Sequence, residues 1–236
     1  MITHIFNSDL LTNEATKALN AHFKNASNNP FLFLMSGGSS LALLNLIDTS
    51  NFNEKSTVAV SDERYSTDPA VNNLAQIEKT LFYKAVTKNG ASVIDSKPGA
   101  GELMNELGAR FDESLKKWIK NNPTGIIIAS AGIGPDAHTT GIMPYPEDNE
   151  LFEKTFDDSS LWAVAYDAKN KNQYNLRITI TLPFIRKINH VVIFASGNSK
   201  KNALTKLLSN DGTLNESPCR IWRELKDVQL FTDQEI

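Results

Sequence analysis

His138 is the residue of this chain best suited to proton transfer, and it lies in the segment AGIGPDAHTTG (131–141). An imidazole titrates near neutral pH, so a histidine in a loop can act as a general base. Asp136 stands two residues earlier and can share a pocket with the ring. The glycines that precede this pair permit backbone conformations that other residues resist. His138 and Asp136 are therefore a candidate acid–base pair, against the simpler alternative of an exposed loop histidine.

The other histidines and the single cysteine, Cys219, argue against a metal centre around His138. His4, His22 and His190 form no ligand-spaced set with His138 along the chain. One cysteine excludes an internal disulfide framework and a cysteine-cluster zinc site, and it fits a reducing compartment. The sequence therefore predicts no metal site.

A second candidate is the segment SGGSS (36–40), which follows the apolar run FLFLM (31–35). Glycines let backbone N–H groups approach a ligand, serine hydroxyls add donors, and the start of a helix favours a phosphate. Neither G-x-G-x-x-G nor G-K-[ST] follows, so the segment is neither a dinucleotide fingerprint nor a P-loop. It predicts either a phosphate cradle or a tight turn with a serine cap.

Charged and amide side chains also follow the next apolar run. Asp62 and Arg64 belong to SDER (61–64), which we expect at the same rim of the sheet as the serine–glycine turn. The alternative is a solvated loop with an internal ion pair. Asn72 opens a later helix, where capping is the simplest interpretation.

Two cations come from later strands. Arg177 begins RITIT, and Lys200 stands at the start of a helix in GNSKKNAL (197–204). A bound phosphate needs countercharges, and these side chains could supply them. Each could equally be a surface charge.

These segments need a scaffold that brings them together, and the hydrophobic pattern predicts one. Apolar runs alternate with helical periodicity, which is typical of an α/β fold with a mainly parallel sheet and helices on both faces. Ligands bind beyond the carboxyl ends of such strands, where these segments lie. We predict a single domain over residues 1–236, in which one face of the strand 177–182 is less buried than the other. The expected strands are 2–6, 31–35, 57–61, 125–130, 161–166, 177–182, 190–196 and 228–232, and the expected helices are 11–23, 41–47, 74–85, 103–118 and 199–209.

Five segments, in order and along most of the chain, resemble the 6-phosphogluconolactonase family: MSGGSS, SDERYSTDPAVNN, GIGPDAHTTGIMP, RITITLP and GNSKKNAL. That family belongs to a larger group with the glucosamine-6-phosphate isomerase/deaminases, and the group shares a Rossmann-like α/β fold. The resemblance implies hydrolysis of 6-phospho-D-glucono-1,5-lactone to 6-phosphogluconate, the second step of the oxidative pentose phosphate pathway. It also implies that no metal or organic cofactor takes part.

The resemblance implies roles for individual residues as well. His138 would take a proton from water as the water attacks the lactone carbonyl, and Asp136 would orient or polarise the imidazole. Asp62 joins them in the catalytic set, and Arg64 lies with it at the sugar end. Asn72 is carried over as a substrate-binding residue. The positions that match phosphate-holding residues of the family are Gly37, Gly38, Ser39, Ser40, Arg177 and Lys200.

The chain departs from the family in the histidine loop. Ala137 stands where the family usually has glycine, and Thr140 and Gly141 stand where it usually has alanine and serine. If residue 137 needs a positive φ, an alanine there is strained by about 1–2 kcal/mol. The loop of this chain is therefore expected to differ in shape.

Composition limits the partners. The net charge of −3, from 24 basic and 27 acidic residues, gives no footprint for nucleic acid or an anionic membrane. The segment MITHIFNSDL lacks the basic and apolar pattern of a secretory leader, and the sequence contains no run of about 18 apolar residues, so we expect a cytoplasmic protein. The expected partner is a small phosphorylated sugar lactone, bound by a monomer or a small homo-oligomer.

Two other functions stay open. A glucosamine-6-phosphate isomerase/deaminase typically carries an acidic residue and proline after the histidine, whereas this chain reads TTGIMP. A non-catalytic sugar-phosphate-binding protein would be expected to lose the histidine, which is present. Turnover of the lactone, with glucosamine 6-phosphate as a control, separates all three.

Overall fold

The chain folds around a parallel sheet in the computed structural model, which describes residues 1–235. Within those residues the sheet has seven strands in the order β1-β10-β9-β6-β2-β3-β5, and every neighbouring pair is parallel. Parallel strands need crossover connections, and the helices between them supply these. The predicted mainly parallel α/β fold is confirmed.

The apolar runs of the sequence form the central strands. The strands are β1 (Ile2–Ile5), β2 (Phe31–Met35), β3 (Ser56–Val60), β4 (Asp62–Arg64), β5 (Ser92–Val93), β6 (Ile126–Ala131), β7 (Ala163–Asp167), β8 (Leu176–Ile180), β9 (His190–Ala195) and β10 (Val228–Thr232). The α-helices are α1 (Ser8–Ala26), α2 (Leu41–Leu44), α3 (Asn73–Ile77), α4 (Leu81–Lys88), α5 (Met104–Asn121), α6 (Asn149–Phe156), α7 (Leu182–Ile185) and α8 (Lys201–Leu208).

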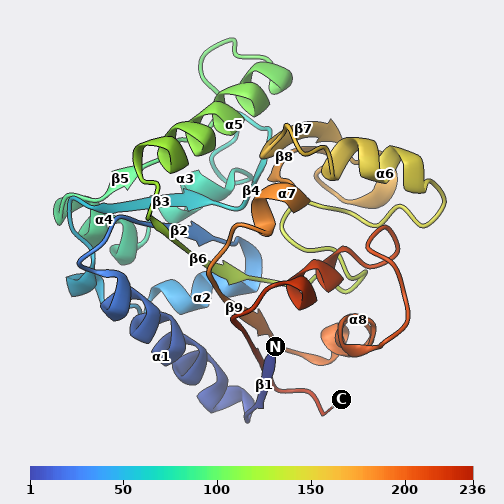
Figure 1. Cartoon of the computed structure of the whole chain (residues 1–236), viewed down its shortest axis with the longest axis horizontal. Helices are drawn as coiled ribbons and strands as arrows, with labels where there is room; N and C mark the ends of the chain where they lie inside the picture. The colour runs from blue at the N-terminus through green and yellow to red at the C-terminus, as the bar shows by residue number, and fades with distance from the viewer. Residues whose placement is uncertain (236) are drawn as a thin grey trace.

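Strand β2 shows how both faces of the sheet are covered. Phe31, Phe33 and Met35 pack into a core cluster with α1 to α4, whereas Leu32 and Leu34 pack into a second cluster with α5 to α8. Alternate residues of a strand point to opposite faces, so a continuous apolar run requires a layer on each side. Figure 1 shows α1 and α5 on opposite sides of the sheet.

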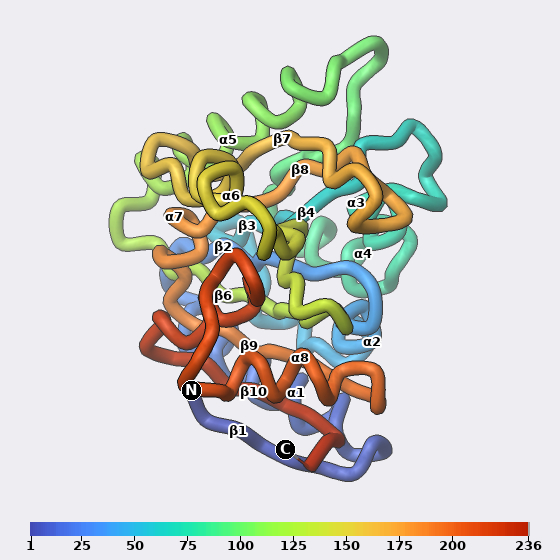
Figure 2. Tube along the Cα trace, turned by 90° about the vertical axis from the view of Figure 1, so that its right-hand side faces the viewer, coloured from blue at the N-terminus to red at the C-terminus, as the bar shows by residue number. Residues whose placement is uncertain are grey.

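A small antiparallel sheet, which the sequence did not predict, lies beside α5. Its order is β4-β8-β7, and Figure 2 shows β7 and β8 next to α5, away from β1. The segment SDER was expected as a loop at the sheet rim, but Asp62–Arg64 form the edge strand β4. The pairing places Asp62 opposite Thr179 and Arg64 opposite Arg177.

The prediction that one face of the strand 177–182 is less buried was wrong, because residues 177–181 are all buried. The strand is central in the small sheet, and its polar side chains have partners inside the protein. Thr179 Oγ1 accepts a hydrogen bond from the backbone N–H of Gly141 at 3.0 Å. A buried hydroxyl that has a hydrogen-bond partner gives the same alternation of apolar and polar residues in the sequence as an exposed hydroxyl.

The helix predicted over 74–85 is two helices, α3 and α4. Thr80 separates them as the N-cap of α4, where its Oγ1 accepts a hydrogen bond from the N–H of Tyr83 at 3.1 Å. A threonine cap satisfies a donor that the first helical turn leaves free, so the chain can restart at a new angle. Of the helices formed within residues 1–235, none has both the length and the apolar content for a membrane span.

Candidate active site

One cavity of about 160 Å³ opens beyond the carboxyl ends of the parallel strands. Segments that follow β2, β6 and β9 line it, together with residues of β4 and β8. Parallel strands end at one edge of the sheet, so distant segments meet there. Eight predicted site residues line the cavity: Gly37, Gly38, Ser39, Asp62, Arg64, His138, Arg177 and Lys200.

His138 and Asp136 form a hydrogen-bonded pair, with 2.5 Å between His138 Nδ1 and Asp136 Oδ1. The imidazole lines the cavity with 23% of its side chain exposed, and Asp136 lies behind it outside the lining. Burial acts to raise the pKa of Asp136, but the hydrogen bond and charge of His138 outweigh it, so the pKa lies below its usual value. An ionised Asp136 can only accept, so Nδ1 carries the proton and Nε2 keeps a free lone pair.

Gly134 makes room for this pair. A Cβ at residue 134 would lie 2.0 Å from His138 Nδ1 and 2.6 Å from Asp136 Oδ1, so no other residue fits unless the ring and the carboxylate move. The backbone closes the turn, since the Gly134 N–H donates to the His138 carbonyl at 2.8 Å. The sequence singled out this glycine for its freedom, but the structure requires it for its lack of a side chain.

Ala137 adopts a φ of +72° and Thr140 a φ of +50°. The condition for strain at residue 137 is therefore met, and a β-branched threonine at positive φ is also strained. The surrounding protein fixes the loop: the Cys219 N–H donates to the Ala137 carbonyl at 3.0 Å, and Trp222 Nε1 donates to Thr139 Oγ1 at 2.8 Å. The loop thus keeps its strained shape through buried contacts.

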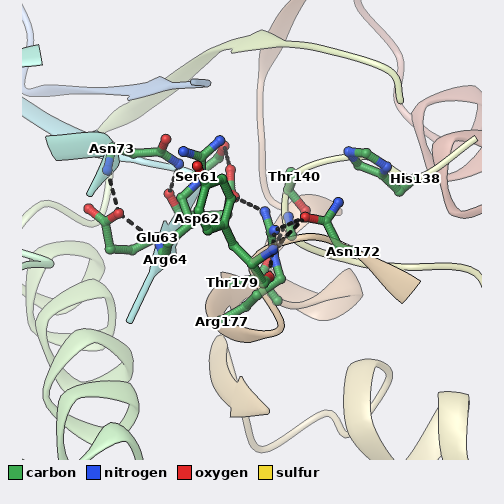
Figure 3. Close-up of polar contacts among 12 residues, drawn as sticks. Ser61, Asp62, Glu63, Arg64, Asn73, His138, Thr140, Asn172, Arg177 and Thr179 are labelled. Atoms are coloured by element: carbon green, nitrogen blue, oxygen red, sulfur yellow. Dashed lines mark hydrogen bonds and ion pairs between the residues drawn. The ribbon is translucent and has the colours of Figure 1, made fainter. Parts of the chain in front are cut away.

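Asp62 and Arg177 form a buried ion pair, with 2.6 Å between Asp62 Oδ2 and Arg177 Nη2. Their side chains are only 7% and 5% exposed, although both line the cavity. The assignment of Asp62 to the sugar end and Arg177 to the phosphate end of the ligand stays a prediction. Figure 3 shows the pair within a network that includes Asn172, while His138 stands apart from it.

Arg64 lies opposite Arg177 in the register of the two strands. Its guanidinium stacks 4.9 Å over the ring of Tyr174 and donates to the Val71 carbonyl at 2.9 Å. These contacts hold the cation at the cavity wall, where cation–π stacking leaves its edge available for an anion.

Besides Asp136, two predicted site residues lie outside the cavity lining. Asn72 is the N-cap of α3, where its Oδ1 accepts from the Ala75 N–H at 2.9 Å, so the structure gives it the capping role. Ser40 is buried, and its hydroxyl has no hydrogen-bond partner within residues 1–235.

Sequence reasoning missed Asn73, which lines the cavity. Its Nδ2 donates to the Asp62 carbonyl at 2.9 Å. A Cβ at Gly37 would lie only 2.5 Å from its Oδ1, so the serine–glycine turn passes directly against the amide. The dipeptide NN was the available signal, but periodicity could not show which asparagine faces the ligand.

Hydrogen bonds to the carboxylate of Glu63 hold the start of α3 in place. Its carboxylate accepts hydrogen bonds from the backbone N–H groups of Asn73 at 2.5 Å and Leu74 at 2.9 Å, and from Ser96 Oγ at 3.0 Å. Burial raises the pKa of Glu63 to about 7, against these hydrogen bonds, which lower it. The residue therefore supports Asn73 rather than touching the cavity.

Lys200 reaches the cavity from the turn before α8, as predicted. Gly197, at a φ of +93°, begins this turn, and its N–H donates to Asp233 Oδ1 at 2.8 Å. Burial lowers the pKa of Lys200, and the charge of Asp136 opposes part of this shift. With Arg64 and Arg177, Lys200 makes a cavity wall suited to an anionic ligand.

Comparison with known proteins adds to this geometry. Residues 7–230 match the sequence pattern of the family described as glucosamine-6-phosphate isomerases/6-phosphogluconolactonase. The chain belongs to this family. The resemblance inferred from the motifs is thereby confirmed.

Relatives of the family are distant in sequence. A 6-phosphogluconolactonase of Borreliella burgdorferi is 25% identical over 162 residues, which cover 69% of this chain and 65% of that protein. The match thus spans slightly less than two thirds of the relative's length. Solved 6-phosphogluconolactonases of Shewanella baltica and Plasmodium vivax share the fold, with TM-scores of 0.77 and 0.76 over 98% of this chain and 96% and 90% of theirs, at 18% and 14% identity.

Proposed function

We propose that this protein hydrolyses 6-phospho-D-glucono-1,5-lactone to 6-phospho-D-gluconate, the second step of the oxidative pentose phosphate pathway. The observation that carries the proposal is the cavity in which His138, backed by Asp136, faces the serine–glycine turn and Lys200. A base and an anion-binding wall in one cavity fit a phosphorylated ester. Family membership supports the same substrate class.

His138 acts as the general base in this proposal. Nε2 takes a proton from a water molecule as its oxygen attacks C1 of the lactone, and a tetrahedral intermediate forms. The intermediate collapses with cleavage of the bond between C1 and the ring oxygen, and the imidazolium returns its proton to that oxygen. Asp136 stabilises the imidazolium and fixes its tautomer through the 2.5 Å hydrogen bond.

The cations and the serine–glycine turn bind the two ends of the substrate. Lys200 and the backbone N–H groups of the turn 37–39 bind the phosphate, because they lie on the side of the cavity formed by segments after β2 and β9. Arg64 and Asp62 lie on the small sheet and contact the sugar, and Arg177, which pairs with Asp62, adds a countercharge for the phosphate. A preorganised cation near the carbonyl would also stabilise the oxyanion that develops there.

The decisive experiment measures acid release from freshly made 6-phosphogluconolactone, corrected for spontaneous hydrolysis. His138→Ala is expected to lower kcat about 10²- to 10⁴-fold with little change in KM, because the base acts in the transition state. His4→Ala is the matched control, since His4 lies on β1 outside the cavity lining, and it should keep wild-type kcat. Unchanged turnover in His138→Ala would remove this residue from the base role.

The same assay tests the alternatives. Glucosamine 6-phosphate is supplied as a second substrate, because the family description includes its isomerases. Release of ammonia from it, without lactone hydrolysis, would replace the proposal by the isomerase/deaminase function. Binding of 6-phosphogluconate without turnover of either substrate would identify a non-catalytic sugar-phosphate-binding protein.

A further inference from the structure

His22, His190 and Asp227 lie together at the amino-terminal ends of the strands, at the end of the sheet opposite the candidate active site. His190 is the first residue of β9, and Asp227 directly precedes β10, so both lie at the amino ends of parallel strands. His22 comes from α1, which packs on these strands. One potential ligand atom from each of the three side chains lies within 4.8 Å of the other two. Within residues 1–235 they are the one such group of three histidine, cysteine or carboxylate side chains.

The contacts within the group are close. His190 Nδ1 and Asp227 Oδ2 lie 2.6 Å apart, and the rings of His22 and His190 stack with 4.4 Å between centroids. All three side chains are half-buried, so an ion from solution can reach them and their positions are still restrained by packing. Gln229 extends from β10 to the same place, with its Nε2 3.4 Å from His22 Nε2.

We propose that His22, His190 and Asp227 bind a divalent transition-metal ion, with zinc as the best-fitting representative. Apart from thiolates, imidazoles and carboxylates are the ligands that zinc prefers. The two imidazoles and one carboxylate leave a fourth position open to water or to the side-chain carbonyl of Gln229. Tetrahedral zinc, about 2.0–2.1 Å from each ligand atom, needs these atoms about 3.3 Å apart. Rotation of half-buried side chains closes the distance from 4.8 Å or less.

The bound ion would be structural rather than catalytic. It would join α1 to the amino ends of β9 and β10, and so add to the stacking of His22 on His190 and to the hydrogen bond between Gln229 and His22. A ligand that binds only the folded state raises the apparent stability. This site is independent of lactone hydrolysis, so its failure would leave the proposed function untouched.

The test is thermal unfolding of metal-stripped protein with and without zinc chloride. At a zinc concentration about a hundredfold above Kd, Tm is expected to rise by about 5–10 °C. His22→Gln, His190→Gln and Asp227→Asn should each abolish most of this rise. Because the readout is the difference that zinc makes within one variant, a lower Tm in the stripped variant does not obscure the result.

Control variants and a spectroscopic probe complete the design. His4→Gln and His138→Gln remove the other two histidines and should keep the zinc-dependent rise. Cobalt chloride should give the visible absorption of low-symmetry, four-coordinate cobalt in the wild type and in both controls, but not in His190→Gln. An unchanged Tm of the wild type in zinc, or a rise that survives in His22→Gln and His190→Gln, would overturn the proposal.

Discussion

Replacing Gly134 by alanine should abolish most of the proposed lactone hydrolysis although no chemical group is lost. The new Cβ would lie 2.0 Å from His138 Nδ1 and 2.1 Å from Cε1, whereas carbon and nitrogen atoms in contact stay about 3.5 Å apart. The imidazole must therefore move by more than about 1 Å. Asp136 Oδ1, at 2.6 Å from the same Cβ, must move as well, so the pair that sets the tautomer is broken.

The magnitude follows from the role of the ring. A misplacement of about 1 Å costs about 10²-fold in rate, and complete loss of a general base costs about 10²- to 10⁴-fold. We expect kcat/KM for the phosphorylated lactone to fall within this range, which corresponds to about 3–5 kcal/mol. The fold should survive, because the clash involves side chains that can rotate. Alanine also lowers the conformational entropy of the unfolded chain, which stabilises the fold by about 0.4–1 kcal/mol. This gain offsets the stability that is lost when the partly exposed His138–Asp136 pair is broken.

Gly132→Ala is the matched control in the same loop. A Cβ at residue 132 would meet only Ser40 Oγ, at 3.4 Å, so His138 and Asp136 keep their places and kcat/KM should stay within about tenfold of wild type. Both variants are measured for lactone hydrolysis and for Tm. Wild-type kcat/KM in Gly134→Ala, at unchanged Tm, would show that the observed ring position is not needed for catalysis.

Three further predictions concern Lys200, which lines the cavity, and Gly141 and Glu63, which lie outside the lining. Lys200→Ala should raise KM for the phosphorylated lactone more than it lowers kcat, and equal loss on unphosphorylated gluconolactone would contradict a phosphate contact. Gly141→Ala should lower the free energy of unfolding by about 1–3 kcal/mol in urea, because its Cβ would lie 2.8 Å from the immobile Thr179 Cβ. Because the pKa of Glu63 is raised from 4.5 to about 7, its contribution to stability is complete below pH 4.5 and is lost as pH rises through about 7. The free energy of unfolding in urea should therefore fall between pH 5 and 8 in wild type relative to Glu63→Gln, by up to about 3 kcal/mol, and parallel pH profiles of the two proteins would refute the shift.

The sequence predicts the central sheet and most of the cavity, because both follow from local patterns. Continuous apolar runs such as 31–35 and 126–129 are typical of strands covered on both faces, and glycine or polar residues mark where each ends. Since parallel strands end at one edge, the residues after them must meet there. His138, Lys200 and the turn 37–39 were predictable for this reason.

Pairing between distant strands was not predictable. Nothing local distinguishes a solvated SDER loop from an edge strand, and only the antiparallel register brings Asp62 to Arg177, 115 residues later. The same limit applies to the asparagine pair, because a shift of one residue at a helix start exchanges the capping side chain with the one that faces the cavity. Asn72 caps and Asn73 lines the cavity because Glu63 fixes the first turn of α3.

Three residues of the histidine loop depart from the family pattern: Ala137, Thr140 and Gly141. The structure connects these departures, because Ala137 and Thr140 are strained and contacts with the small sheet hold the loop. Thr140 Oγ1 lies 3.1 Å from Thr179 Oγ1, and the Gly141 N–H donates to that same hydroxyl, so Thr179 holds both residues. A side chain at residue 141 would collide with Thr179, which explains why glycine stands there. The threonine at 140, the glycine at 141 and the threonine at 179 therefore form one arrangement that fixes the loop from the small sheet. This arrangement keeps the His138 ring in place even though Ala137 lacks the conformational freedom of glycine.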